Sequence, residues 1–512
     1  MTRSRPPAVG RAGIRAGIAA ALGILAGLLA WVAGRGLTGS PAAAILLGLA
    51  GAVAVGMLCL RRPPLILDEE AASRPLLTLG AASAVLALVQ IARLAVFTID
   101  PSRIGYSMVP NSDWEVRHSC LTAYAVAARA AGAAPNVYED ALYSLPSVDP
   151  TALRTPRLLG PFKVDVYEYP PPFLLLPRAL SWSSGEGLPT MPEFDRLRML
   201  WFALDVGVIV LAVVVTARLL PPAAGTRAIL LAPLLFCALP TAGMIQKGNA
   251  QGMILALSML AMALFERRRS AAGGMILAFA GASKLYPGLL GVFLLVRRRW
   301  RDVFLTAACG VVFALASLVA FGRGPWDAFL DHLPRLLSGE SFPAFRNPMA
   351  MAINHSIPGL VFKAHVFGAP ASFEAMKVVG WIYTLAAVAA IALASRRALR
   401  PEERPVLWLG ILILATLRSP FLPQAYAAFP ALWLLTLGGA LEAATPRRLG
   451  LLLLLWAGLN IVWPLDWPID PRRLALLSTV PQCLTILLAV LALLPRRARV
   501  PAQDEEPLRQ AA

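Results

Sequence analysis

Carboxylate side chains are concentrated in one polar segment of the chain. Residues 99–195 hold eleven of the 29 acidic residues, and long apolar runs flank this segment on both sides. Near its start, Asp113 and Glu115 stand on either side of Trp114. A carboxylate among aromatic rings at a membrane surface suits a general base for a hydroxyl group, because a low local dielectric and a nearby cation tune its pKa. The same pattern suits the solvated start of a helix with Ser112 or Asp113 as N-cap, so both interpretations stay open.

An aromatic and proline-rich run, Tyr167 to Phe173, follows in the same segment. Consecutive prolines favour extended backbone, and Tyr167 and Tyr169 offer flat faces with polar tips. Such a surface suits a platform for a sugar or an isoprenoid phosphate. An aromatic belt at the membrane interface would give the same pattern.

A lysine interrupts an apolar stretch in the middle of the chain. Arg269 and Arg297 flank this stretch, and both basic flanks are expected on the same side of the membrane. Two short helices that meet part-way across the membrane satisfy this requirement, with the break between Ser283 and Pro287, since proline disfavours helix at the preceding residue. Non-helical backbone at this depth needs protein or a wet cavity around it, so Lys284 is a candidate functional cation. Snorkelling of Lys284 to an interface is the alternative.

Further polar groups stand at the ends of later apolar runs. Asn249 and Gln251 lie in a short turn, where their amides could bind hydroxyl groups or cap the next helix. Asn354 and His355 adjoin each other, and the imidazole could bind phosphate, donate a proton or make a structural hydrogen bond. Arg418 could hold a phosphate through two hydrogen bonds or simply snorkel.

The composition identifies a membrane protein. Hydrophobic residues make up 58% of the chain and charged residues 15%, with a mean hydropathy of +0.66, whereas soluble domains are roughly 45–50% apolar and about 25% charged. Apolar runs of about 20 residues recur, and each can cross a hydrocarbon core of about 30 Å as a helix. We therefore expect an all-α polytopic membrane protein with about 12–14 transmembrane segments.

The formal charge of +18 does not indicate nucleic-acid binding, because the arginines cluster at the ends of apolar runs, as in cytoplasmic loops of membrane proteins. We expect the protein in the inner or plasma membrane of the cell. Alternation of the predicted spans across this membrane puts both termini in the cytoplasm. The segments 99–196 and 322–375 then lie outside as large loops. We expect four parts: an additional transmembrane hairpin over 1–74, a membrane core over 75–440, a second hairpin over 441–494 and a disordered cytoplasmic tail over 495–512.

The sequence contains no motif for a metal or nucleotide cofactor. Its five cysteines show neither a disulfide framework nor metal-ligand spacing. Asp113, Glu115 and His118 could form a metal site, but such a group in a polar loop arises readily by chance. We therefore expect no cofactor and no metal.

Taken in order, these features resemble the GT-C membrane glycosyltransferases, in particular glycosyltransferase family 87, the polyprenyl-phosphate-mannose-dependent α-mannosyltransferases. The resemblance covers about residues 75–440 and rests on the ordered set rather than on one motif. The matching pieces are Asp113, Ala127-Ala128-Arg129-Ala130, Pro135-x-x-Tyr138, Tyr167-x-Tyr169-Pro170-Pro171, Gly248-Asn249-Ala250-Gln251, Phe265-Glu266-Arg267-Arg268-Arg269, Lys284-Leu285-Tyr286-Pro287, Arg297-Arg298-Arg299-Trp300-Arg301, Asn354-His355-Ser356 and Ser419-Pro420.

The resemblance implies a GT-C-like bundle with a large first extracytoplasmic loop, under which a hexose, expected to be mannose, moves from a polyprenyl-phosphate donor to a lipid or glycan acceptor with inversion. Asp113 would be the base, with Glu115 as its rival, and Lys284 would bind the donor phosphate. Membrane lipids are further partners, and nucleic acid is not. The remaining substrate-binding candidates are Tyr167, Tyr169, Asn249, Gln251, Asn354, His355 and Arg418.

Two departures from the family pattern weaken single assignments. The spacing from Asp113 to the Ala-Ala-Arg-Ala stretch is longer than usual, and the usual Gly-Gln-x-Asn turn reads Gly-Asn-x-Gln here. A transporter or lipid flippase is an alternative, because transporters use discontinuous helices. A GT-C enzyme that uses another lipid-linked sugar, such as arabinose, is another.

Overall fold

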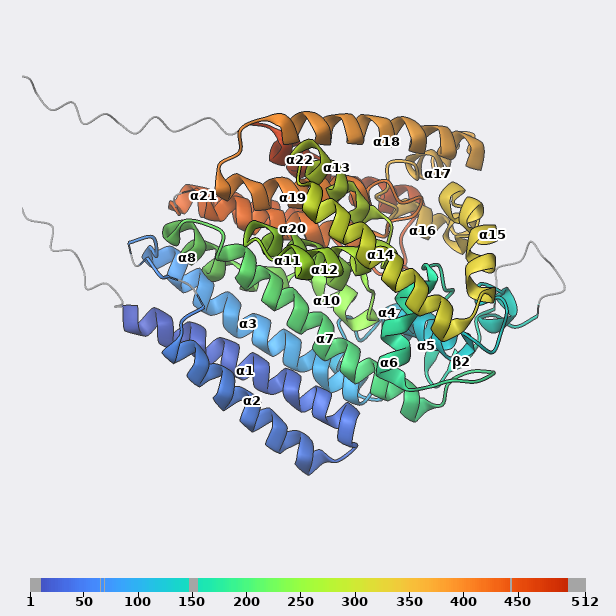
Figure 1. Cartoon of the computed structure of the whole chain (residues 1–512), viewed down its shortest axis with the longest axis horizontal. Helices are drawn as coiled ribbons and strands as arrows, with labels where there is room; N and C mark the ends of the chain where they lie inside the picture. Colours follow the sequence, from blue (N-terminus) through green and yellow to red (C-terminus); the bar gives the residue numbers. More distant parts are fainter. Residues whose placement is uncertain (1–10, 65, 69, 147–154, 443, 496–512) are drawn as a thin grey trace, which may run out of the picture.

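The computed structural model describes residues 11–64, 66–68, 70–146, 155–442 and 444–495. Helices make up nearly all of its regular structure (Figure 1), which confirms the expected all-α class. Of the tail predicted over 495–512, all but the first residue lies outside the described residues.

Seven of the described helices are long and apolar enough to cross a membrane. They are α1 (Arg11–Thr38), α2 (Pro41–Arg61), α3 (Arg74–Ile99), α7 (Met191–Ala217), α14 (Trp300–Phe321), α18 (Phe373–Arg396) and α22 (Pro471–Leu493). A further candidate span is bent by 65° and is built from α8 (Pro222–Leu231), α9 (Pro233–Cys237) and α10 (Leu239–Lys247). The chain is therefore a multi-pass membrane protein, as its composition predicts.

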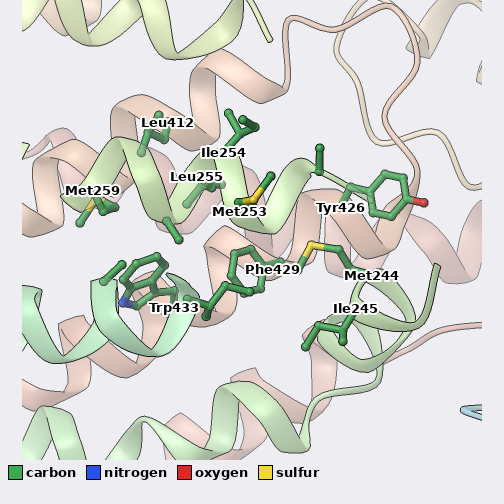
Figure 2. Close-up of a cluster of buried hydrophobic side chains, with 14 of the residues drawn as sticks. Met244, Ile245, Met253, Ile254, Leu255, Met259, Leu412, Tyr426, Phe429 and Trp433 are labelled. Carbon is green, nitrogen blue, oxygen red and sulfur yellow. The ribbon is translucent and has the colours of Figure 1, made fainter. Parts of the chain in front are cut away.

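Shorter helices complete the bundle. They are α11 (Gln251–Glu266), α12 (Ser270–Ser283), α13 (Leu290–Val296), α19 (Arg404–Thr416), α20 (Gln424–Ala440) and α21 (Pro446–Leu459). Of these, α11, α19 and α20 are almost entirely buried and fill the centre. Figure 2 shows apolar side chains of α10, α11, α19 and α20 packed together in this centre, with Tyr426 at the edge of the cluster. Long, exposed apolar faces on helices such as α2 and α14 suit contact with lipid rather than water.

The predicted break in the middle of the chain is confirmed. Helix α12 ends at Ser283, Lys284 has extended backbone (φ −139°, ψ 132°), and a 3-10 helix, Tyr286–Leu289, leads into α13. The missing amide of Pro287 and its constraint on the preceding residue account for the interruption. Lys284 thus projects from irregular backbone between two short helices.

The polar segment between α3 and α7 folds into small elements at one end of the bundle (Figure 1). Its helices are α4 (Asp113–Arg117), α5 (Leu121–Ala130) and α6 (Leu175–Ser181), with 3-10 turns at Ile104–Tyr106, Asp140–Leu142 and Pro171–Leu174. The helix start expected at Ser112 or Asp113 is the start of α4, where Ser112 is the N-cap and accepts a hydrogen bond from the Glu115 amide at 3.1 Å. The proline run is extended only as far as Pro170, because the following residues turn into the 3-10 helix.

A small three-stranded sheet lies within this segment. Strand β1 (His118–Ser119) pairs in parallel with β3 (Phe162–Val164), which pairs antiparallel with β2 (Leu158–Leu159). The segment after α14 contributes α15 (Gly324–Ser338), α16 (Pro348–Ala352) and α17 (Leu360–His365), with a 3-10 helix at Pro343–Arg346. Another 3-10 turn, Pro401–Glu403, precedes α19. Helices α15, α16 and α17 lie at the same end of the bundle as α4 and α5 (Figure 1).

Candidate active site

A cavity of about 1130 Å³ opens where the small sheet meets the helix bundle. Polar side chains of the segment between α3 and α7 and of the turn between α10 and α11 line one part of it. Apolar side chains of α15, together with Trp381 of α18, line another part. A volume of this size fits the pockets in which proteins bind small molecules. The cavity therefore combines a polar cluster and an apolar wall in one space.

The parallel pairing of β1 and β3 determines which side chains meet in the polar cluster. His118 lies opposite Lys163, and Ser119 lies opposite Val164. The next residues along the two strands are Cys120 and Asp165. Because parallel strands leave a sheet on the same edge, these two side chains and His118 are brought together at the cavity.

Three potential ligand or proton-transfer groups thus converge. The His118 Nε2 atom lies 3.8 Å from Cys120 Sγ and 3.9 Å from Asp165 Oδ2, and all three groups lie within 4.8 Å of one another. His118 stacks on Trp114 with ring centroids 4.7 Å apart. The Asp165 side chain is 38% exposed, and that exposure is toward the cavity that it lines.

The surroundings of this trio disfavour charge on all three side chains. Burial raises the pKa of Asp165 to about 6, against the hydrogen bond from the Val166 amide. Burial, followed by the positive charges of Lys247 and Lys163, lowers the pKa of His118 to about 3. Burial and the nearby Asp165 raise the pKa of the Cys120 thiol to about 11. Such shifted groups in a cleft are typical of functional sites.

The two carboxylates predicted as bases are both paired with lysines. Glu115 is nearly buried, lines the cavity, and its Oε2 atom lies 2.8 Å from Lys247 Nζ. Asp113 is 61% exposed, does not line the cavity, and pairs with Lys163 Nζ at 3.2 Å. The structure thus brings Glu115 into the cavity and leaves Asp113 beside it.

Lys284 reaches the cavity from the predicted helix break. Its Nζ atom donates to Gln251 Oε1 at 3.0 Å and lies 5.1 Å from the centroid of the Tyr169 ring. Asn249 is turned toward the trio, because its Nδ2 donates to Cys120 Sγ at 3.2 Å. Of these residues, Lys284, Gln251 and Tyr169 line the cavity, whereas Asn249 supports it from behind.

The two tyrosines of the predicted platform have different environments. The Tyr169 ring lines the cavity, and its hydroxyl accepts a hydrogen bond from the Tyr124 hydroxyl at 2.8 Å. Tyr167 is fully buried and donates to the Pro170 carbonyl at 3.1 Å. Only Tyr169 can therefore face a ligand in this arrangement, and Tyr167 packs beneath it.

Asn354 and His355 lie outside the cavity lining. Both are fully buried. The Asn354 amide accepts from the backbone amides of Ser356 and Leu422 at 3.0 Å and donates to the Pro420 carbonyl at 3.2 Å. These contacts join two chain segments, so the predicted substrate-binding amide is occupied by backbone.

Arg418 lines the cavity next to its apolar wall. Its Nε atom donates to Thr384 Oγ1 at 2.5 Å, which holds the guanidinium against α18. Thr384, Trp381 and Lys377 recur at helical spacing along the cavity face of α18. On α15, Leu330 and Leu337 face the cavity and remain 58% and 43% exposed.

Sequence reasoning missed several residues of the polar cluster. Cys120 stands alone in the sequence. Lys247 lies far from Glu115 in the sequence, so the ion pair between them is visible only in the structure. The sequence suggests His118 as a metal ligand only beside Asp113 and Glu115. Nothing in the sequence distinguishes Asp165 from the other acidic residues of its segment. The strand pairing that unites these residues joins segments more than forty residues apart, and two- or three-residue strands leave almost no periodic signal.

Comparison with known proteins finds one family. Residues 167–420 match glycosyltransferase family 87. No match was found among curated proteins or among solved structures. The matched range contains Tyr169, Lys247, Gln251, Lys284 and Arg418 of the cavity, and it begins after the segment that carries Asp113, Glu115 and the trio.

Proposed function

Because its residues 167–420 belong to glycosyltransferase family 87, this chain is a membrane glycosyltransferase, and we propose that it transfers a hexose, with mannose the first candidate, from a polyprenyl-phosphate donor to a lipid or glycan acceptor. The observation that carries this proposal is the single cavity that joins a polar cluster to an exposed apolar wall. A lipid-linked sugar has the same two halves.

The apolar wall suits the lipid chain of the donor. Leu330 and Leu337 of α15 are exposed where they line the cavity, and Trp381 of α18 extends the same lining. Exposed apolar surface that is gathered in one place marks a ligand or membrane contact. Covering it with an isoprenoid chain removes apolar area from water, which is favourable at about 25 cal/mol per Å².

The adjoining cations suit the donor phosphate. Lys284 and Arg418 both line the cavity, and Gln251 and Thr384 hold their polar heads in place. A guanidinium can bind a phosphate with two parallel hydrogen bonds, and an ammonium adds a point charge. The Tyr169 ring beside Lys284 offers an apolar face for the sugar.

The transfer needs a proton acceptor. The acceptor oxygen forms a bond to the anomeric carbon from the face opposite the phosphate, while the bond from that carbon to the phosphate oxygen breaks. The bonding electrons leave with the polyprenyl phosphate, the anomeric configuration inverts, and the hydroxyl proton must pass to a base. We assign its removal to Asp165 rather than to Asp113 or Glu115, because Asp165 faces the cavity and the other two neutralise lysines.

The arginine distribution supports a position of the cavity on the extracytoplasmic side. Basic residues cluster at the opposite ends of the predicted spans, as positively charged cytoplasmic loops do. Nucleotide sugars are made in the cytoplasm, so a transferase that faces outward would require a donor carried by lipid.

The test uses the full chain reconstituted in lipid vesicles and a panel of polyprenyl-phosphate sugars that includes mannose, glucose and arabinose. We expect one sugar to be transferred or slowly hydrolysed, and Asp165→Asn to reduce the rate by about 10²- to 10⁴-fold. Asp113→Asn is the matched control, because Asp113 is outside the cavity, and it should keep most of the activity.

Three results would contradict the proposal. Release of sugar from none of the donors would exclude the donor class. Full activity in Asp165→Asn would exclude Asp165. Movement of intact lipid-linked sugar across the vesicle, without cleavage, would indicate a flippase instead.

A further inference from the structure

The donor atoms of His118, Cys120 and Asp165 have the chemistry of a transition-metal site. Thiolate, imidazole and carboxylate are the ligands that zinc and related divalent ions use, with bonds of about 2.0–2.3 Å. In a tetrahedral site, such bonds place the ligand atoms about 3.3–3.8 Å apart. His118 Nε2 lies 3.8 Å from Cys120 Sγ and 3.9 Å from Asp165 Oδ2, and all three ligand atoms lie within 4.8 Å of one another. A closer approach of the Cys120 and Asp165 side chains would bring all three atoms to one ion.

The backbone positions the ligands independently of any ion. The Cys120 amide donates to the Lys247 carbonyl at 2.9 Å, which fixes the end of β1 against α10. The Asp165 amide donates to Thr122 Oγ1 at 2.9 Å, and the Val166 amide occupies Asp165 Oδ1 at 2.9 Å. Asp165 Oδ2 is the oxygen that faces His118.

Neighbouring groups also resemble the outer shell of a metal site. Asn249 Nδ2 lies 3.2 Å from Cys120 Sγ, and the Tyr426 hydroxyl lies 3.3 Å from the same sulfur. Hydrogen bonds of this kind stabilise a thiolate and orient metal ligands. Trp114 stacks on the His118 ring and limits its rotation.

The local charge balance permits a cation. Three lysines lie near the trio. Lys247 lies 2.8 Å from Glu115 and Lys163 lies 3.2 Å from Asp113, so two of them face carboxylates, while Lys284 donates to Gln251 Oε1 at 3.0 Å. Among the described residues, the ion pair found for Asp165 is with His118, which carries charge only when protonated. Asp165 and a Cys120 thiolate can therefore supply negative charge to a bound ion.

We propose that His118, Cys120 and Asp165 form a binding site for one divalent ion of the zinc class, with a fourth coordination position open to the cavity. All three residues line that cavity. Three protein ligands and one open position are the arrangement of catalytic rather than structural zinc sites.

The consequence for catalysis rests on the proposed transferase function. An acceptor hydroxyl at the open coordination position of such an ion would have its pKa lowered, as zinc lowers that of bound water. Asp165 would then promote loss of the acceptor proton by holding the ion rather than by taking the proton as a free base. His118 and Cys120 would become as important to the rate as Asp165.

The first experiment measures metal alone. Full-length protein in detergent is stripped with a chelator and titrated with Co²⁺, whose thiolate complexes absorb in the near ultraviolet, and with Zn²⁺ as competitor. We expect one ion per chain with a thiolate-to-cobalt band. Cys120→Ser should lose the band, and His118→Ala and Asp165→Asn should weaken binding at least tenfold. Cys309→Ser, which alters a thiol of α14 away from the cavity, should bind like the wild type.

Size-exclusion profiles and helical circular dichroism show whether each variant is folded. A wild-type protein that binds no Co²⁺, or a folded Cys120→Ser variant with an unchanged cobalt band, would overturn the site. Metal binding in a protein that cleaves no polyprenyl-phosphate sugar would leave the site standing and remove the transferase proposal. Transfer that persists in metal-free protein and in Cys120→Ser would show instead that Asp165 acts without an ion.

Discussion

Two polar regions of this molecule contrast sharply in what their side chains do. The segment Asn354-His355-Ser356 contains residue types that suggest chemistry, yet its Asn354 amide and Ser356 hydroxyl bond to backbone at Pro420 and it lies outside the cavity. His118, Cys120 and Asp165 form no motif in the sequence, yet they converge in the cavity. A polar residue is thus available for chemistry only when the backbone around it is already satisfied by other groups.

The two regions differ in how their buried backbone groups find hydrogen-bond partners. The segment 353–359 and the segment 417–424 cross as irregular chains, and their buried amides and carbonyls need partners. Asn354 and Ser356 supply five of those bonds: one each to the amides of Ser356, Leu422 and Gly359, and two to the Pro420 carbonyl. At the trio, β1 and β3 satisfy most of the backbone by pairing with each other, so the side chains stay free to face the cavity.

The largest expected effect is a loss of transfer rate on substitution of Asp165, which would distinguish the trio from the Asn354 region. Asp165→Asn should lower transfer by about 10²- to 10⁴-fold with little change in the apparent unfolding temperature, because the amide keeps the acceptor that the Val166 amide uses. Single-turnover rates and thermal unfolding of the detergent-purified variant measure both. A large loss of stability with a normal rate per folded molecule would reverse the assignment of this region.

Asn354→Ala should show the opposite behaviour. The change removes three hydrogen bonds from buried backbone groups, and we expect a loss of about 3 kcal/mol of stability. Activity per folded molecule should change less than threefold, as judged from rates normalised to the monodisperse fraction. A rate loss of a hundredfold or more at unchanged stability would place Asn354 in the catalytic machinery after all.

Glu115→Gln tests the buried ion pair at the border of the polar cluster. It leaves Lys247 without its carboxylate 2.8 Å away, and breaking one half of a buried pair typically costs about 3 kcal/mol. Lys247→Met in the same background should recover part of the stability, since it removes the unpaired charge. The double-mutant cycle, followed by thermal unfolding, gives the coupling; independent effects of the two changes would show that the pair contributes nothing.

The smallest effect concerns the apolar wall. Leu330→Asn should raise the KM for a long-chain polyprenyl-phosphate sugar by about tenfold, because it removes apolar contact worth one to two kcal/mol, and leave the KM for a short-chain donor unchanged. Leu158→Asn alters an exposed leucine of β2 that does not line the cavity and serves as control. Equal effects on both donors would mean that the lipid chain lies elsewhere.

Local and periodic features were predictable from residues alone. The apolar runs predict the membrane helices, the helix start at Ser112 or Asp113 predicts a cap that the structure assigns to Ser112, and the proline after Tyr286 predicts the break beside Lys284. The ordered motifs indicate family 87, which the match over 167–420 confirms. The inferences about the helices, the cap and the break depend on interactions within a few residues or on burial in lipid, and both leave a local pattern in the sequence. The family was indicated by resemblance of the motif order.

Which side chains face the cavity was decided only by tertiary structure. Asp113 and Glu115 lie two residues apart, yet one is exposed beside the cavity and the other is buried in it, because Lys163 and Lys247 arrive from separate segments. The meeting of Cys120 and Asp165 depends on the register of two strands of two and three residues. Contacts between distant segments leave no local signal in one sequence. In a membrane each backbone group must be satisfied internally, so apolar segments form helices, and the composition alone predicts them.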